Sequence, residues 1–147
     1  MNTKFEEVFK KYMERIVSYN LAEKTNEDKI EDMISKLKTA LGRFKLTYMD
    51  CDIEADYEKQ EFNRELEPIE MNIIALGLVA EFVTQKVNSV KVMKNHLSTK
   101  DFNLYSSANM LKQLQSTLKI VQNDVLYWET KLEYHRKAKK ILDGDKK

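Results

Sequence analysis

The feature of the sequence that most limits the fold is a long apolar repeat near the C-terminus. Its residues recur at alternating spacings of three and four, which is the pattern of a helix that packs along one side over many turns. They are Leu111, Leu114, Leu118, Val121, Val125, Trp128 and Leu132. A continuous helix from Ser107 to Leu142 would span about 50 Å. We therefore predict that its end projects beyond the bundle that this chain can build.

Three earlier segments also have helical patterns. Phe5–Val17 and Ile30–Phe44 each carry one apolar stripe, and we expect them to form an antiparallel pair. Glu67-Pro68 is typical of a helix start, because the missing proline N–H would have no partner in a first turn. Residues 73–83 are apolar on nearly all sides, which predicts a helix enclosed by its neighbours. Gly77 in this helix indicates a close crossing with another helix.

Shorter signals divide the remainder of the chain. Val90, Met93 and Leu97 predict a short separate helix that Ser98–Asp101 ends. Thr25 and Asp28 form a capping-box pattern before the second helix. For the long last helix, we expect a cap at Ser106 or Ser107.

The composition favours one all-α domain over residues 1–147, a small helical bundle. Three glycines and one proline suit long helices with few tight turns. A formal net charge of +1 gives no overall attraction to nucleic acid or to an anionic membrane. The N-terminus lacks a signal-peptide pattern, and the single cysteine excludes an internal disulfide. The longest apolar run is far shorter than the roughly 20 residues of a membrane span, so we expect a soluble, unexported protein.

The segment 45–66 loses the helical period and is strongly acidic. Residues 50–70 hold nine acids against Lys59 and Arg64. Polar and apolar residues alternate within it, which predicts an extended arm or short β-hairpin with one wet face. The predicted wet face consists of Asp50, Asp52, Glu54 and Asp56. The spacing faintly resembles a calcium loop, but Ala55 stands where that loop needs glycine, so we expect a solvated or partner-facing acidic face.

No pattern of catalytic or metal-binding residues is present in the sequence. His96, His135 and Cys51 lack the spacing of a zinc site, and no histidine with an orienting acid accompanies the serines. Glycine-rich phosphate loops are also absent. We therefore expect a protein that is not an enzyme and needs no cofactor or metal.

The C-terminal segment 133–147 is basic and has two interpretations. Cations at a helix C-terminus complement the helix dipole, which is the commoner reason for such a pattern. Alternatively, the segment is a tail that docks on an acidic partner, with apolar side chains holding the contact. The residues that would form this docking tail are Tyr134, His135, Arg136, Lys137, Lys139, Lys140, Ile141 and Leu142. The helical body would then comprise residues 1–44 and 67–132.

The stretch from Phe62 to Ala138 carries several short motifs in a recognisable order. It resembles the head–tail connector (adaptor) proteins of long-tailed bacteriophages. The motifs that carry the resemblance are the lead-in FNREL at 62–66, the core IIALGLVAEFV at 73–83, Gln85 to Asn88, KDF at 100–102, YSSAN at 105–109, and the tail residues Tyr134 and Arg136.

The resemblance implies a structural virion protein made in the host bacterial cytoplasm. Such connectors form a ring, commonly of twelve copies, at the neck between capsid and tail. Their C-terminal segments engage the portal protein, and their lower face receives the stopper or tail-completion protein. DNA passes through the channel without specific binding, and no membrane is involved. By this resemblance the tail from Tyr134 to Leu142 would dock on the portal, and the acidic arm would face the channel or a neighbouring copy.

Two other functions fit parts of the sequence. The repeat Leu111–Leu132 could form the dimer interface of a cytosolic helical regulator. The basic tail could belong to a DNA-binding module, although the acidic arm disfavours that function.

Overall fold

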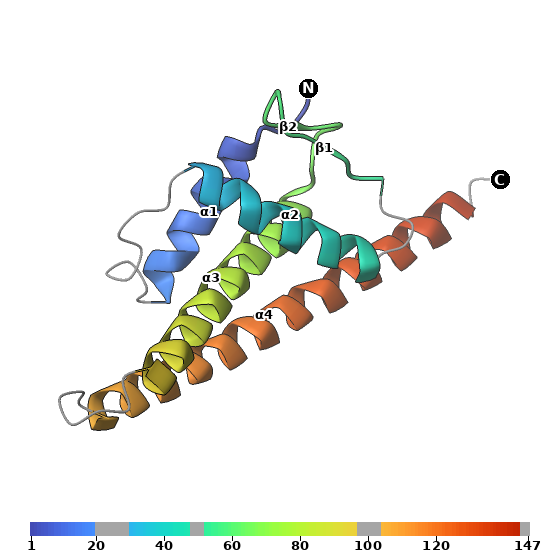
Figure 1. The fold of residues 1–147 in the computed structure, drawn as a ribbon. Helices are drawn as coiled ribbons and strands as arrows, with labels where there is room; N and C mark the ends of the chain where they lie inside the picture. Colours follow the sequence, from blue (N-terminus) through green and yellow to red (C-terminus); the bar gives the residue numbers. More distant parts are fainter. Residues whose placement is uncertain (20–29, 48–51, 97–103, 145–147) are drawn as a thin grey trace.

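The computed structural model describes residues 1–19, 30–47, 52–96 and 104–144, and Figure 1 shows their arrangement. The predicted all-α class is confirmed, and so is the short β-hairpin in the acidic segment. The elements are α1 (Phe5–Ser18), α2 (Ile30–Thr47), β1 (Ala55–Asp56), β2 (Glu61–Phe62), α3 (Pro68–His96) and α4 (Leu104–Gly144).

Helix α3 lies at the centre of the fold. Helix α4 runs beside it in the opposite direction, while α1 and α2 pack on it near its beginning (Figure 1). Ile74, Leu78 and Val83 are at most 1% exposed, as an apolar surface on all sides predicts. The span Pro68–Lys91 is long and apolar enough to cross a membrane, yet 56% of its most apolar window is buried inside the fold. Packing against three helices therefore accounts for its composition.

The inner side of α4 forms the seam that the heptad pattern predicts. Leu114, Val121, Val125 and Leu132 are buried, and the other members of the repeat are partly buried against the same core. Because this seam packs against α3 of its own chain, a dimer through it would first have to displace α3.

The crossing of α2 over α3 depends on the glycine that the sequence singled out. A Cβ added at Gly77 would lie 3.1 Å from the Cβ of Ala40 in α2. That distance is shorter than ordinary van der Waals contact, so a larger side chain would push the helices apart. The prediction of a close crossing at Gly77 is confirmed.

The predicted antiparallel pairing of α1 with α2 is wrong. Both helices pack chiefly on α3 and contact each other little. Their apolar stripes are nevertheless buried as expected, with Phe5, Tyr12 and Leu37 fully enclosed. The physical reason is that α3 is apolar on nearly every side and covers each stripe separately.

Several predicted boundaries also differ from the structure. Helix α3 continues to His96, so Val90 and Met93 belong to it and form no separate helix. Helix α2 continues to Thr47, past the predicted start of the arm at residue 45. Helix α4 begins at Leu104, which places Ser106 and Ser107 inside the helix rather than at its cap. The predicted capping box in 20–29, and the breaker and KDF motif in 97–103, lie outside the described residues.

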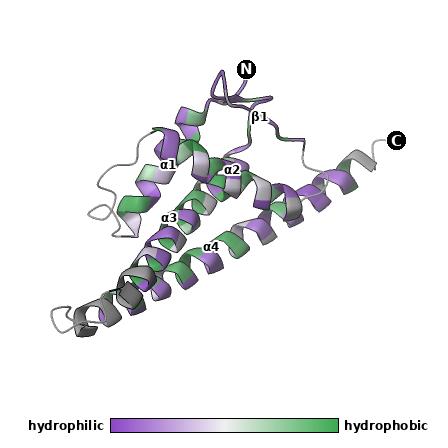
Figure 2. Cartoon of the chain, viewed as in Figure 1, coloured by the Kyte–Doolittle hydropathy of each residue, from purple (hydrophilic) through white to green (hydrophobic). Residues whose placement is uncertain are grey.

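Residues 52–65, called here the acidic hairpin, are fastened to the N-terminal segment. The Phe62 N–H donates to the Thr3 carbonyl at 2.8 Å, and the Thr3 N–H donates to the Arg64 carbonyl at 3.1 Å. Ile53 and Phe62 are fully buried, while the hairpin's outer face is hydrophilic (Figure 2). The predicted alternation is confirmed from Asp52 to Asp56 and ends at Tyr57, which is exposed. The arm folds onto its own chain instead of extending away from it.

Replacing Gly77 by leucine should destabilise the fold by about 1–3 kcal/mol, because the side chain would enter the contact with Ala40. The matched control is Gly42→Leu in α2, where an added Cβ meets nothing within 4 Å. That control should be neutral or stabilise by up to about 1 kcal/mol, since glycine is a poor helix former. Chemical denaturation monitored by circular dichroism measures both, and equal effects would contradict the close crossing.

Candidate functional site

The most unusual side chain in the described structure is Glu70, a carboxylate that is 1% exposed. It occupies the third position of α3, and its Oε1 accepts a hydrogen bond from the Glu67 N–H at 2.9 Å. This bond satisfies one of the free N–H groups at the start of α3. The positive end of the helix dipole further favours a carboxylate at this place.

Two arginines from distant parts of the chain complete the surroundings of Glu70. Arg64, at the end of the acidic hairpin, donates from both Nη atoms to the two carboxylate oxygens at 2.9 and 2.7 Å. Arg136 of α4 donates to Oε2 at 3.3 Å. Arg64 also donates from Nε to Asp52 Oδ1 at 3.0 Å. The carboxylate therefore joins the hairpin, the start of α3 and the later part of α4.

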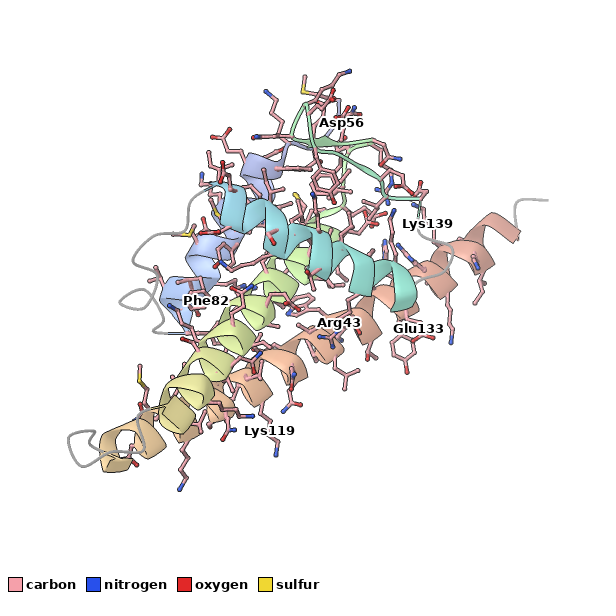
Figure 3. The ribbon with its side chains drawn as sticks, in the orientation of Figure 1. Arg43, Asp56, Phe82, Lys119, Glu133 and Lys139 are labelled. Carbon is pink, nitrogen blue, oxygen red and sulfur yellow. The ribbon has the colours of Figure 1, made fainter. Side chains whose placement is uncertain are left out.

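Glu67 makes a second set of contacts with α4. Its Oε2 lies 3.1 Å from His135 Nε2, and its Oε1 lies 3.7 Å from Lys139 Nζ. Figure 3 shows Lys139 on the side of α4 that faces the hairpin. We call the whole group the Glu70 cluster. It consists of Asp52, Arg64, Glu67, Glu70, His135, Arg136 and Lys139.

The ionisation of Glu70 follows from these contacts. Burial alone would raise the pKa of Glu70, since it disfavours the charged form. The hydrogen bonds from Arg64 and the Glu67 N–H, with the charges of Arg64 and Arg136, outweigh burial and hold the pKa below its ordinary value of 4.5. The carboxylate is thus charged at neutral pH, and its charge is compensated.

The structure brings the predicted acidic arm and the predicted basic tail together. Asp52 from the arm and His135, Arg136 and Lys139 from the tail all belong to the Glu70 cluster. These three basic residues of the predicted docking tail thus have partners within their own chain, and the docking of the tail on a portal stays a prediction. Their intramolecular partners, Glu67 and Glu70, were not singled out as sites, because they lie more than 60 residues away in the sequence and no local pattern links them.

The other predicted residues of the arm lie on the surface of the hairpin. Glu54 pairs with Lys45 of α2 at 2.7 Å, and Asp56 Oδ1 accepts the N–H groups of Glu58 and Lys59 at 3.1 Å. Asp56 therefore stabilises the turn of the hairpin. Asp50 and Cys51 lie outside the described residues.

The other predicted residues of the tail lie on the exposed side of α4. Tyr134, Ile141 and Leu142 are more than 60% exposed, and Lys140 is also exposed. Lys137 pairs with Glu133 one turn away, at 3.5 Å. These five residues leave an outward surface that the Glu70 cluster does not use.

A second apolar repeat runs along the outward side of α4. Ile120, Tyr127, Tyr134 and Ile141 stand at intervals of seven residues, and each is at least 51% exposed. At 3.6 residues per turn this outer stripe lies about 150° around the helix from the buried seam. A shallow groove of about 470 Å³ lies along it, lined by Asn123, Leu126, Tyr127, Thr130, Lys131 and Tyr134. The sequence analysis missed this stripe, although a second seven-residue repeat offset from the seam was visible.

Within the described part of the chain, no group of three or more histidine, cysteine or acidic side chains could hold a metal ion. Comparison with protein-family models, with curated proteins and with solved structures finds no match for this chain. The site therefore has to be interpreted from its own geometry, which offers ion pairs inside the chain and an apolar stripe outside it.

Replacing Glu70 by glutamine should destabilise the fold by about 2 kcal/mol, because two arginines would lose the charge that compensates them. The matched control is Glu133→Gln, which removes the exposed i,i+4 pair with Lys137 and should cost less than about 0.5 kcal/mol. Urea denaturation at pH 7 measures both values. A Glu70 variant no less stable than the control would show that the cluster adds nothing to the fold.

The same variant should change the response to acid. Folding lowers the pKa of Glu70, so its ionised carboxylate stabilises the folded state. This stabilisation is complete above pH 4.5 and is lost as the pH falls through the lower pKa that Glu70 has in the folded protein. Burial raises the pKa of Glu129, whose contribution has the opposite sign. Urea denaturation from pH 7 to pH 3 gives the free energy of unfolding of wild type and of Glu70→Gln. The difference between the two values reports on Glu70 alone, and it should become smaller as the pH falls. A difference that grows would contradict the lowered pKa.

Proposed function

We propose that this protein is a structural subunit of a bacteriophage neck, a head–tail connector that assembles as a ring between the portal and the tail. The observation that supports the proposal most is that α4 has apolar side chains on two opposite sides. Its inner side completes the fold against α3, while its outer stripe presents four large apolar side chains to the surroundings. A seven-residue repeat of exposed apolar groups is the surface that a helix offers to another protein.

The likeness of Phe62–Ala138 to connector proteins supports the same function. The stretch includes the buried helix α3, most of the Glu70 cluster and the outer stripe as far as Tyr134. A subunit of a ring must hold its contact surfaces in a constant relation. Glu70 of α3 serves that purpose, because it pairs with Arg64 of the hairpin and with Arg136 of α4. The lower neighbour would be a stopper or tail-completion protein, and the genome would pass through the ring without specific binding.

The remaining part of the docking tail is the portal contact in this proposal. The last described turn of α4 extends beyond the start of α3 in Figure 1 and bears exposed Ile141 and Leu142. Apolar side chains at the end of a basic helix suit a contact in which charge guides the approach and burial holds the complex. Three basic residues of the tail pair with carboxylates of the same subunit: His135 and Lys139 with Glu67, and Arg136 with Glu70.

Electron microscopy of the protein mixed with capsids that carry the cognate portal tests the function directly. The proposal predicts an added ring at the portal vertex. Capsids that remain bare at saturating protein concentration would exclude the connector function.

Removing residues 140–147 should spare the fold and weaken portal attachment at least tenfold, a loss of about 1.4 kcal/mol. The fold survives because Leu132 and the Glu70 cluster precede the deletion. The full-length variant Ile141→Ser/Leu142→Ser should behave in the same way, whereas Glu133→Gln serves as an exposed control. Co-sedimentation with portal-bearing capsids measures attachment, and thermal melting confirms folding. Undiminished attachment would mean that the portal contact lies elsewhere, in the YSSAN region at the start of α4.

A further inference from the structure

The outer stripe is bordered by positive charge. Among the described side chains from Asn109 to Leu142, the exposed charged residues are six lysines and one carboxylate, Glu133, and of the lysines only Lys139 contacts Glu67 on the other side of the helix. Lys131 Nζ lies 5.4 Å from the centre of the Tyr127 ring, so the positive charge extends over the stripe itself. Figure 3 shows Lys119 pointing away from α3. A partner for this surface has to be acidic and must offer some apolar area.

The acidic hairpin of the same protein has the complementary properties. Its exposed charged residues are five carboxylates and one lysine, Lys59, within the described range 52–65. Asp56 and Glu61 stand directly opposite each other in the β1–β2 pair, and like charges in such positions destabilise a hairpin. A basic surface laid on this face would relieve that repulsion. Tyr57, at 36% exposure, supplies an aromatic ring beside the turn.

We propose that the outer stripe of α4 in one copy binds the acidic hairpin of a second copy, head to tail. A contact between two different surfaces leaves one of each unoccupied, so it repeats from copy to copy, and it forms a ring when the rotation between copies closes. The inference rests on the proposed ring and names the interface that would build it. Within each copy the Glu70 cluster connects the two surfaces, because Arg64 ends the hairpin and Arg136 belongs to α4.

Pairing of two outer stripes is the main alternative for a second copy. The outer stripe has a symmetric order of side chains, Ile120, Tyr127, Tyr134 and Ile141. Two stripes could therefore pack antiparallel, with each tyrosine beside a tyrosine and each isoleucine beside an isoleucine. That arrangement would place Lys131 of one copy beside Lys131 of the other at the centre of the contact. The surrounding lysines would add to this repulsion, whereas the hairpin offers carboxylates of opposite charge.

Reciprocal charge reversal distinguishes these arrangements. The stripe variant is Lys119→Glu/Lys131→Glu. The hairpin variant is Glu58→Lys/Glu61→Lys, which keeps Asp56 in the turn, Glu54 on Lys45 and Asp52 on Arg64. Each variant alone should self-associate at least tenfold more weakly than wild type in sedimentation velocity at low ionic strength. An equimolar mixture should associate again, because each reversed surface then meets its opposite, and added salt should weaken the mixture and the wild type alike.

Three results would overturn the proposal. Unchanged or stronger association of the stripe variant, with no effect of the hairpin variant, would indicate paired stripes, because the reversal does not add to the repulsion between two lysine-rich surfaces. Failure of the mixture to associate, when wild type does, would exclude this interface while leaving the ring itself intact. The wild type could instead bind single-stranded DNA in a salt-sensitive way without self-association. If the stripe variant loses this binding and the hairpin variant strengthens it, the stripe is a nucleic-acid surface. A wild type that stays monomeric both alone and on portal-bearing capsids would exclude the inference and the connector function together.

Discussion

The arrangement of the hairpin and of α4 relative to the start of α3 depends on the ion pairs and hydrogen bonds of the buried Glu70 carboxylate. A charge with 1% exposure is tolerated only when hydrogen bonds and opposite charges surround it. Here the Glu67 N–H, Arg64 and Arg136 supply them, and they come from the start of α3, the hairpin and α4. Moving any one of these segments would leave Glu70 short of a partner, so the cluster holds the three segments in register.

Helix α4 illustrates how one helix can serve both folding and assembly. Its inner seam is buried against α3 from Leu114 to Leu132, and the hydrogen bond from Tyr19 to Asp124 adds a link from the end of α1. Its outer stripe has the same seven-residue period, and each of its four side chains is more than half exposed. Because a rigid helix carries both surfaces, the position of the outer stripe is set by the packing of the inner one.

Much of the fold could be predicted because local patterns determine it. The heptad seam, the proline at the start of α3, the alternation around Ile53 and the glycine at the helix crossing were all readable from neighbouring residues. The pairing of α1 with α2 was wrong because a short connection favours adjacent packing, while the more extensive apolar surface of α3 competes for both stripes. Helix α3 does not end at the polar residues Asn88 and Ser89, because both lie on its exposed side.

The candidate site was harder to predict than the fold. Arg136 and Glu70 are 66 residues apart, and only the antiparallel return of α4 along α3 brings them to one place. The sequence therefore contained no sign that His135, Arg136 and Lys139 of the basic tail contact carboxylates of their own chain. The outer stripe was overlooked for a different reason, since the stronger inner repeat occupies the same helix and masks the second period.

Hydroxyl-radical footprinting of the free and the assembled protein tests the central claim that the outer stripe is the assembly surface. Tyr127 and Tyr134 are 55% and 67% exposed in the single subunit, whereas Tyr12 is fully buried and serves as an internal reference. The account predicts strong modification of Tyr127 and Tyr134 in dilute protein and a several-fold decrease on assembly, with Tyr12 protected throughout. Equal modification of the two outer tyrosines before and after assembly would contradict it.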